Sequence, residues 1–569
     1  MKSEPVMRPL PSVLDLLHHS LQAWDACYDP AAGLVAVAAR DPGYHTRMRP
    51  GQRVHPTKES ADYAHLLLLR NGPGDTARAE AILDVLLDLQ VTDPTSIHAG
   101  IWGWYAEEPP AAMAPADWNW ADFLGARLTE ILVAAEHRLD PRRAARVRQA
   151  LVHATRAILV RDIGPWYTNI CAMGAAVCLG AGRLLGDADL VAYGRRRIAA
   201  QRVACEVNGG VPEYNSPHYT TILIQELERI LRLSDDVEAR RHAEWLRQRM
   251  WALLTSQIHP GTGQWAGAQG RVYHDLLQPE YALFLWQRTG IPLLGVAAMT
   301  FRAGPDELQD LASVPCPSDL LPRLAALPAE PLEVRQTWMP ATEREPARIL
   351  TTWFSHAATL GSVNQSTTWV QHRPITGYWR TPAGVASLRL HLRKDGRDFA
   401  TGLLRTVQSG PRLLTLVGLA VDQGDWHCSL DRPQDGTFLV GDLRLRLALT
   451  GPGAVVEALP DGRWSLAAGD HRVVVGPPQG RFDGQPVTAW IAGTDATGVF
   501  LEVPLHHGPA RHLTPRTVGE TGIAVALEVL APGEEPRNGI PQGPGEGESQ
   551  RWTCTGIPGV LQAPRHPVG

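Results

Sequence analysis

Residues 208–219 read Asn-Gly-Gly-Val-Pro-Glu-Tyr-Asn-Ser-Pro-His-Tyr, and this stretch separates two predicted helices. The glycine pair predicts a turn. Ser216 and Pro217 predict the start of the next helix, because serine suits the N-cap and proline the first helical position. A carboxylate, an amide, an imidazole and two phenols gather around that start. Since a helix N-terminus presents unpaired N–H groups and a positive dipole end, the stretch indicates both a turn between helices and a place for an anionic ligand.

The first half of the chain predicts a succession of helices. Apolar residues recur there at three- and four-residue spacing, and the joins are short and contain Gly, Pro, Asp or Asn. Helical hairpins without a fixed-period repeat favour a toroid over a regular solenoid. The predicted helices are Val13–Tyr28, Lys58–Arg70, Asp75–Leu89, Trp118–Leu139, Pro141–Arg161, Asn169–Leu185, Asp187–Cys205, Pro217–Leu233, Asp236–Gln257 and His274–Arg288.

The second half changes to a period of two. Alternation at 388–392 recurs at 443–447, the run Val473-Val474-Val475 predicts a buried strand, and turns separate the runs, as in an antiparallel β-sandwich. We therefore predict an α+β multidomain chain. Its expected parts are a toroid of helical hairpins (1–302), a Pro-rich linker (303–348), an antiparallel β-sheet domain (349–531) and a Pro/Gly-rich tail (532–569).

Composition excludes several classes of function. The net charge of −5, without a Lys/Arg-rich run, gives no case for nucleic acid, and no window of about 18 apolar residues lacks a charge, so no membrane span is expected. Seven scattered cysteines and an N-terminus without a signal-peptide pattern favour reduced thiols and a cytoplasmic protein. No metal or cofactor is predicted, and the oligomeric state stays open. Eighteen tryptophans suit sugar binding, although tryptophan also fills cores.

Several clusters combine residue types that bind sugars or transfer protons. Around the helix start at 217 lie Glu213, Tyr214, Asn215, His218 and Tyr219. The other candidates are Asn169 at a second helix start, Gln269, Arg271 and Tyr273 in a glycine-rich loop, Trp102, Trp104 and Trp120 between hairpins, and Asn364 and His372 on early strands. Several of them also have a structural alternative: Tyr219 shares an apolar stripe with Leu223, a lone histidine such as His218 is more often structural than catalytic, Asn169 suits an N-cap, Arg271 suits a solvated loop, and the tryptophans can close hairpins.

The chain resembles the (α/α)-toroid polysaccharide lyases and heparinase II/III-like proteins. The resemblance lies in Asn-Ser-Pro-x-Tyr after a Gly-Gly turn, in the later segment Ala-Gly-x-x-x-Arg-x-Tyr at 266–273, and in Leu-Gly-Ser-Val-Asn at 360–364 followed by Trp-x-Gln-x-Arg-Pro at 369–374. It implies an incomplete toroid followed by antiparallel sheets over most of residues 1–530. The chain departs from the family motif at His218, where we associate threonine with the position before the tyrosine.

The resemblance implies β-elimination at a uronic acid in an oligosaccharide or polysaccharide. Asn169, Asn215 and Arg271 would neutralise the uronate carboxylate and thereby stabilise an enolate-like intermediate. A tyrosine or histidine would act as the base and a tyrosine as the acid. Tyr219 is the expected base and acid, and His218 is the alternative base.

Two other classes of function stay open. A glycoside hydrolase on an (α/α) barrel would need a pair of carboxylates across a cleft, and Glu213 is its leading candidate. A sugar-binding or scaffold protein without catalysis would use the tryptophan loops. Neither class uses the amide, phenol and arginine clusters together, whereas a lyase does.

Overall fold

A computed structural model describes residues 21–22, 24–40, 44–294, 314–327, 329–342, 346–543 and 549–567. Two compact units divide the chain. The helical unit comprises Met1–Val207, Tyr219–Trp251 and Gln278–Ser318, and the sheet unit comprises Asn208–His218, Ala252–Leu277 and Asp319–Gly569. Two segments from the first half of the chain, 208–218 and 252–277, therefore belong with the strands of the second half.

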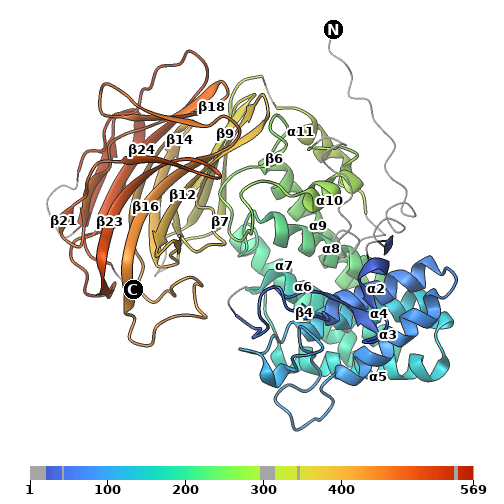
Figure 1. The fold of residues 1–569 in the computed structure, drawn as a ribbon. Coiled ribbons are helices and arrows are strands. Elements are labelled where there is room, and N and C mark those ends of the chain that lie inside the picture. The colour runs from blue at the N-terminus through green and yellow to red at the C-terminus, as the bar shows by residue number, and fades with distance from the viewer. Residues whose placement is uncertain are drawn as a thin grey trace. The chain divides into compact units, whose positions relative to one another are not determined.

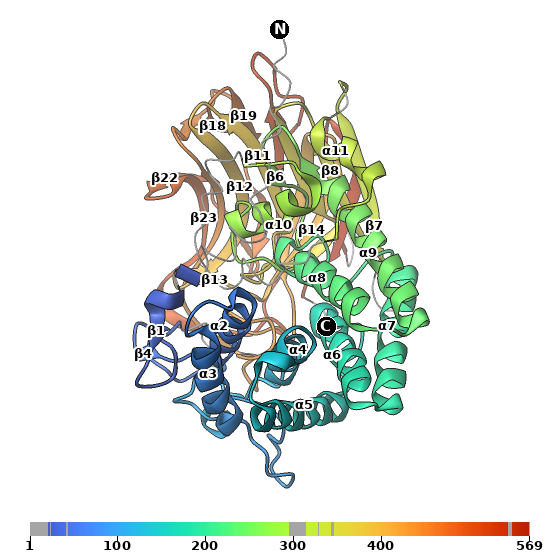
Figure 2. The same ribbon diagram turned by 90° about the vertical axis from the view of Figure 1, so that its right-hand side faces the viewer.

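The helical unit consists of helical hairpins arranged in two layers. Helix α2 contacts α3 and α4, and α4 contacts α5 and α6, so that even-numbered helices neighbour one another and odd-numbered helices cover them. Figure 2 shows α2 to α7 following one another around an open arc. The incomplete toroid is confirmed. Its helices are α2 (Thr57–Arg70), α3 (Asp75–Leu89), α4 (Trp120–Ala135), α5 (Pro141–Arg161), α6 (Thr168–Leu185), α7 (Ala188–Asn208), α8 (Pro217–Leu233), α9 (Val237–Gln257) and α10 (Pro279–Thr289).

The helix ends follow the turn chemistry of the sequence. Asp140 caps α5 by accepting hydrogen bonds from the backbone N–H groups of Arg142 and Arg143, with Pro141 in the first turn. Gly186 ends α6 at a φ of 68°, a left-handed conformation that glycine adopts without strain. Most predicted helices are therefore confirmed to within two residues at each end.

Four predicted helices differ from the structure. The helix predicted at Asp187–Cys205 continues for three further residues, to Asn208. The stretch His274–Arg288 begins its helix only at Pro279, because proline starts a helix well and residues 274–278 form a loop. The stretch Trp118–Leu139 divides into α4 and a short 3-10 helix, η2 (Glu136–Arg138). The stretch Val13–Tyr28 lies in large part outside the described residues, and its last residue belongs to strand β1 (Tyr28–Asp29).

Helix α6 forms the centre of the helical unit. All its residues from Thr168 to Gly182 are buried. By length and composition α6 is apolar enough to cross a membrane, but 83% of its apolar window is buried inside the protein, as in the core helix of a globular unit. Small residues allow this burial: a Cβ on Gly194 would lie 2.9 Å from the carbonyl oxygen of Ala175.

The sheet unit consists of two nine-stranded antiparallel sheets (Figure 1). The β14 sheet has the order β10 (Gln365–Thr367), β14 (Gly402–Ser409), β15 (Arg412–Leu419), β24 (Gly522–Leu530), β19 (His471–Val475), β18 (Trp464–Ala468) and β17 (Val455–Ala458), with β20 (Gln479–Phe482) and β21 (Gln485–Pro486) beside it. The β12 sheet has the order β22 (Ile491–Asp495), β23 (Gly498–Leu513), β16 (Phe438–Thr450), β12 (Gly384–Lys394), β11 (Ile375–Thr381), β9 (Ala358–Val363), β8 (Arg348–Phe354) and β7 (Leu332–Met339), with β13 (Arg397–Asp398) beside β12.

The two sheets pack face to face through one apolar core. Leu388 and Leu390 of the β12 sheet share this core with Val473 and Val525 of the β14 sheet. The indole nitrogen of Trp379 donates to the carbonyl oxygen of Ala468, 3.0 Å away, across the two sheets. The period of two read from the sequence therefore places alternate leucines inward, and the predicted β-sandwich is confirmed.

Short elements complete the two units. Near the C-terminus, β25 (Ser549–Cys554) and β26 (Ile557–Pro564) form a hairpin whose Trp552 and Leu561 pack with Leu414 and Leu416 of the β14 sheet. The remaining elements are β2 (Leu34–Val35), β3 (Val37–Ala38), β4 (Arg53–Val54), η1 (Pro110–Ala112), β5 (Ile258–His259), β6 (Gln264–Trp265), η4 (Ser318–Leu320) and α11 (Leu321–Ala325).

The segment after β6 lies directly on strand β9. A Cβ on Gly361 would lie 2.4 Å from the Cα of Gly267, so only glycine permits this approach. The backbone of Gln269 pairs with that of Arg373 just before β11. The loop that carries Arg271 is therefore fixed to the sheet by backbone contacts on two sides.

Gly361→Ala is predicted to destabilise the sheet unit by about 1–3 kcal/mol, because the new methyl group must displace the backbone of Gly267. Urea unfolding followed by tryptophan fluorescence measures the effect. Gly418→Ala is the matched control, since its Cβ on β15 would meet its nearest atom, the carbonyl oxygen of Thr521, at 3.8 Å. Equal unfolding midpoints for the two variants would contradict the close approach.

Candidate functional site

The turn before α8 is held by the side chain of Asn215. Asn215 has a φ of 48°, a left-handed conformation that asparagine tolerates better than most residues. Its amide nitrogen donates to the carbonyl oxygens of Ala266 and Ala268 at 2.8 and 2.9 Å, and its Oδ1 accepts a hydrogen bond of 2.6 Å from Trp265. Because both amide hydrogens are engaged, the geometry gives Asn215 the role of joining two loops.

Arg271 is fixed by three side chains. Its Nη1 donates to Oε1 of Glu213 at 2.5 Å, and its Nε donates to Oε1 of Gln371 at 3.0 Å. The guanidinium carbon lies 5.5 Å from the ring centroid of Trp369. A planar guanidinium held on two edges and over an aromatic face has a defined direction, which suits the recognition of a carboxylate.

Backbone contacts join the two loops on which this arginine depends. The N–H of Gly270 donates to the carbonyl oxygen of Tyr214 at 2.8 Å, and the hydroxyl of Ser216 donates to the carbonyl oxygen of Arg271. The side chain of Gln269 is buried and donates to the carbonyl oxygen of Trp265. Tyr214 is buried, with its ring 6.0 Å from that of Trp338, and this burial raises its pKa. Tyr214 and Gln269 thus support the loops.

His372 lies beside the same tryptophan. Its ring centroid is 5.1 Å from that of Trp369, and its Nδ1 lies 3.0 Å from Oγ1 of Thr367 and 3.3 Å from Oγ of Ser366. Burial lowers the pKa of His372 to about 3. The imidazole is therefore neutral at neutral pH, where it can form hydrogen bonds but is a weak base.

A second aromatic contact joins two of the three candidate proton-transfer residues. The rings of His218 and Tyr273 meet edge to face with centroids 5.1 Å apart, and 46% of the Tyr273 surface is exposed. Tyr219 is the third residue of α8, follows His218 in the chain and is buried. The sheet unit therefore contains His218 and Tyr273 in contact, while Tyr219 belongs to the helical unit.

The helical unit contains a polar cluster at the start of α6. Asn169 is buried, and its Oδ1 has no hydrogen-bond partner among the described residues. Tyr167, two residues before Asn169, accepts a hydrogen bond of 3.1 Å at its hydroxyl from the amide of Asn119. The carboxylate of Asp122 on α4 lies 4.0 Å from Arg197 on α7, which in turn donates to the carbonyl oxygen of Ile170.

The predicted tryptophans differ in burial and in the contacts that they make. Trp102 is fully buried and donates to the carbonyl oxygen of Leu86, which makes it a core residue and argues against a sugar contact. Trp104 and Trp120 are half-buried and stack with ring centroids 5.2 Å apart. Asn364 bonds the N–H of Ile349 and the carbonyl oxygen of Ala347, so its amide joins backbone segments and its sugar contact stays a prediction.

The structure adds three residues to the candidates. Trp369 and Gln371 both contact Arg271, and the ring of His427 lies 5.0 Å from that of Trp369. Trp369 and Gln371 stand two residues apart in the motif Trp-x-Gln-x-Arg-Pro, which could have indicated them. His427 lies in a loop between β15 and β16, and nothing in the sequence joins it to that motif.

Three comparisons relate the chain to known proteins. A family model described as "Domain of unknown function (DUF8769)" matches residues 14–291. No curated protein matches the sequence.

Among the part of the chain that the structure describes, no group of three or more His, Cys, Asp or Glu residues is arranged to hold a metal ion.

Solved structures of three polysaccharide lyases are similar to this chain in fold. The crystal structure of heparinase III matches at 10% identity and a TM-score of 0.46, covering 99% of this chain and 93% of that one. A heparan sulfate lyase mutant from Pedobacter heparinus matches at 10% identity and a TM-score of 0.35, with 100% and 92% covered. The Streptomyces coelicolor chondroitin AC lyase matches at 10% identity and a TM-score of 0.35, with 93% and 98% covered. At this level of identity the likeness concerns the fold alone.

Asp122 is predicted to make the stability of the helical unit depend on pH. Burial raises the pKa of Asp122 to about 7, since its Oδ1 has no hydrogen-bond partner among the described residues and lies no nearer than 4.0 Å to the guanidinium of Arg197. The folded state therefore holds a proton that the unfolded chain releases near pH 4, so that stability falls as the pH rises from about 4 to about 7. Asp122→Asn is expected to be the more stable protein by about 2 kcal/mol at pH 8 and to lose this advantage at pH 4.

Thermal unfolding between pH 4 and 8 measures the difference. Asp88→Asn is the matched control, because the Asp88 carboxylate is largely exposed and pairs only at the surface with Arg146. A parallel pH profile for Asp122→Asn and the parent protein would refute a protonated Asp122.

Proposed function

We propose that the chain is a lyase that cleaves a uronic-acid glycosidic bond in an oligosaccharide or polysaccharide by β-elimination. The observation that supports this most is Arg271, which Glu213 and Gln371 orient over Trp369 while His218 and Tyr273 meet edge to face. The cluster combines an oriented cation with imidazole and phenol groups. This is the set of groups that elimination next to a carboxylate requires.

The chemistry explains why an oriented cation matters. Elimination removes the C5 proton of the uronic acid and expels the glycosidic oxygen at C4. That proton is weakly acidic until the neighbouring carboxylate is neutralised, because its loss places negative charge on the carboxylate oxygens. A guanidinium that is already fixed in direction stabilises this charge without reorganising during the reaction.

The proton transfers are assigned to tyrosine and histidine side chains. Tyr219 is the proposed base and acid, and His218 is the alternative base. Tyr273 stays a candidate acid, since its ring is exposed and contacts His218. His372, neutral at neutral pH, is assigned a hydrogen bond to a sugar hydroxyl rather than a proton transfer.

The hydrolase alternative depends on Glu213. Its carboxylate is bridged to Arg271 and its side chain is 7% exposed, which uses the carboxylate to hold the arginine rather than to flank a glycosidic bond. Cytoplasmic location stays a prediction of the sequence.

The test is ultraviolet absorbance during incubation with uronate oligosaccharides. Elimination creates a C4–C5 double bond conjugated to the carboxylate, whereas hydrolysis creates none. Tyr219→Phe is predicted to lower kcat by about 10²-fold or more through loss of proton transfer. Tyr28→Phe, in the β1–β2 hairpin, is the control. New reducing ends without absorbance would move the assignment to a hydrolase, and full activity in Tyr219→Phe would move the base to His218.

Arg271→Lys tests the carboxylate neutraliser separately. Lysine keeps the charge but loses the fixed fork, so kcat/KM is predicted to fall by about 10²-fold with most of the loss in kcat. The control is Arg142→Lys, at an exposed position in the first turn of α5. An unchanged kcat with a raised KM would show that Arg271 only binds substrate.

A further inference from the structure

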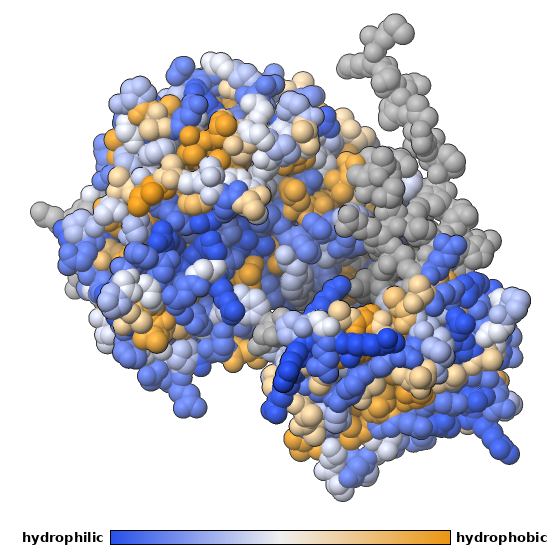
Figure 3. All heavy atoms as spheres, in the orientation of Figure 1, coloured by the Kyte–Doolittle hydropathy of each residue, from blue (hydrophilic) through white to orange (hydrophobic). Residues whose placement is uncertain are grey.

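A polar cleft lies on the outward face of the β12 sheet. Strand β12 turns Leu388, Leu390 and Leu392 inward, and strand β16 turns Leu445, Leu447 and Leu449 inward. The alternate residues therefore face outward, among them Arg389, His391 and Arg393 on β12 and Arg444, Arg446 and Ala448 on β16. Figure 3 shows hydrophilic residues gathered over the strands that Figure 1 labels β16 and β12.

The cleft encloses about 380 Å³. This volume lies within the range of roughly 300–1,000 Å³ that small-ligand sites occupy. Ala448 gives it a small apolar surface, and charged side chains and threonine hydroxyls surround that surface. An apolar patch bordered by fixed polar groups suits a sugar ring, whose C–H faces are apolar and whose edges carry hydroxyls.

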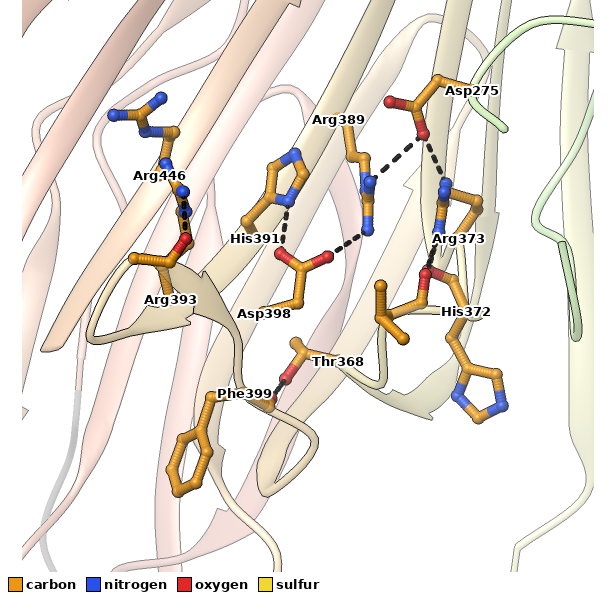
Figure 4. Close-up of polar contacts among 12 residues, drawn as sticks. Asp275, Thr368, His372, Arg373, Arg389, His391, Arg393, Asp398, Phe399 and Arg446 are labelled. Atoms are coloured by element: carbon orange, nitrogen blue, oxygen red, sulfur yellow. Dashed lines mark hydrogen bonds and ion pairs between the residues drawn. The ribbon is translucent and has the colours of Figure 1, made fainter. Parts of the chain in front are cut away.

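Ion pairs fix the carboxylates that line the cleft. Asp275 lies between Arg373 and Arg389, at 2.5 and 3.2 Å, and Asp398 lies between Arg389 and His391, each at 2.8 Å (Figure 4). Each carboxylate thus bonds two guanidinium or imidazole groups, and Arg389 of β12 is shared by both carboxylates. Their negative charge is balanced, and their geometry is set before any ligand arrives.

Arg446 is fixed by other partners. It donates to Glu502 at 2.5 Å and to Asp495 at 2.8 Å, and its guanidinium carbon lies 3.7 Å from the ring centroid of Phe500. His391 and Arg446 are directly opposite in the strand register. Arg393 follows His391 by two residues on the same face, so the two arginines are diagonal neighbours.

Arg393 differs from the other arginines of this face. Within the described ranges it has no carboxylate partner, and its Nη2 donates to the carbonyl oxygen of Gly396 in the following turn. It lines the cleft together with Arg446. Two neighbouring guanidinium groups, one of them without a countercharge, attract an anion that can accept hydrogen bonds from both.

We propose that this cleft binds a sugar unit that carries a carboxylate or sulfate group. Arg393 and Arg446 hold the anion, Ala448 packs against the ring, and the Nε2 of His391 accepts a hydrogen bond from a hydroxyl. His391 can do so because its Nδ1 already bonds Asp398 at 2.8 Å. The site is distinct from the Arg271 cluster, since its two arginines come from β12 and β16, and it does not depend on the proposed reaction.

The test is binding of defined oligosaccharides to the full chain by titration calorimetry. The probes are an unsulfated hexasaccharide with alternating glucuronate units, its sulfated counterpart and its carboxyl-reduced counterpart. All titrations use protein that carries Tyr219→Phe, because this substitution is expected to prevent turnover of the probe. Comparison of the first two probes distinguishes carboxylate from sulfate as the recognised group, and the third shows whether charge is needed at all.

Two variants act on different features of the cleft. Arg393→Gln is expected to weaken binding of the acidic probe by about tenfold or more through loss of a charge-assisted contact. Ala448→Phe fills the cleft, keeps every charge and is expected to abolish the same binding event. Arg397→Gln is the matched control, since Arg397 is exposed at the start of β13 and does not line the cleft.

The proposal is overturned if Arg393→Gln and Ala448→Phe, both folded by circular dichroism, bind the acidic probe as tightly as the parent protein. It is also overturned if Arg397→Gln weakens binding as much as Arg393→Gln, which would indicate attraction to surface charge in general. Binding that survives Arg271→Lys but not Ala448→Phe supports a site separate from the proposed catalytic cluster, whether or not any probe is cleaved.

Discussion

The hydrogen bonds of Asn215 are the constraint on which the candidate site depends. One amide side chain bonds Trp265, Ala266 and Ala268, and so joins the turn before α8 to the loop that carries Arg271. A buried amide satisfied at three points stabilises one geometry, because moving either loop leaves polar groups unpaired. The second loop is fixed in turn where Gly267 lies against Gly361. The direction of the Arg271 guanidinium therefore follows from contacts several residues away from it.

Throughout the sheet unit, carboxylates hold arginine and histidine side chains in fixed positions. Glu213 holds Arg271, Asp398 holds Arg389 and His391, and Glu502 holds Arg446, all with partners from different strands or loops. Arginines directly opposite each other on neighbouring strands, such as Arg393 and Arg444, would repel more strongly without the carboxylates of Asp442 and Glu502 that pair with Arg444. The acids therefore allow arginines to be dense on one face of a sheet. Because each pair needs residues distant in sequence, the packing of the sandwich is what brings them together.

The sequence predicted the architecture well and the site only in part. Helices such as α5, with Asp140-Pro141 at its start, and strands such as β12 have patterns that repeat locally, so their bounds could be read from the chain. The role of an individual amide side chain could not be read from the chain. Asn215 and Asn364 were expected to contact substrate, which stays a prediction; both also bond backbone groups that join separate segments, and nothing local in the sequence indicates this structural role. Trp369 and Gln371 were visible as a motif, but their contact with Arg271 depends on a pairing between residues 269 and 373.

Arg271 and Arg393 illustrate two ways of presenting a cation. Arg271 has two side-chain partners and an aromatic face, so its direction is set and little conformational entropy remains to be lost when an anion binds. Arg393 is held by a backbone carbonyl in a turn, which leaves its charge without a carboxylate in the described part of the sheet unit. The first arrangement favours precise stabilisation of a developing charge, and the second favours attraction of a charged group. A chain that acts on acidic sugars needs both, because a substrate must be attracted before its carboxylate can be aligned.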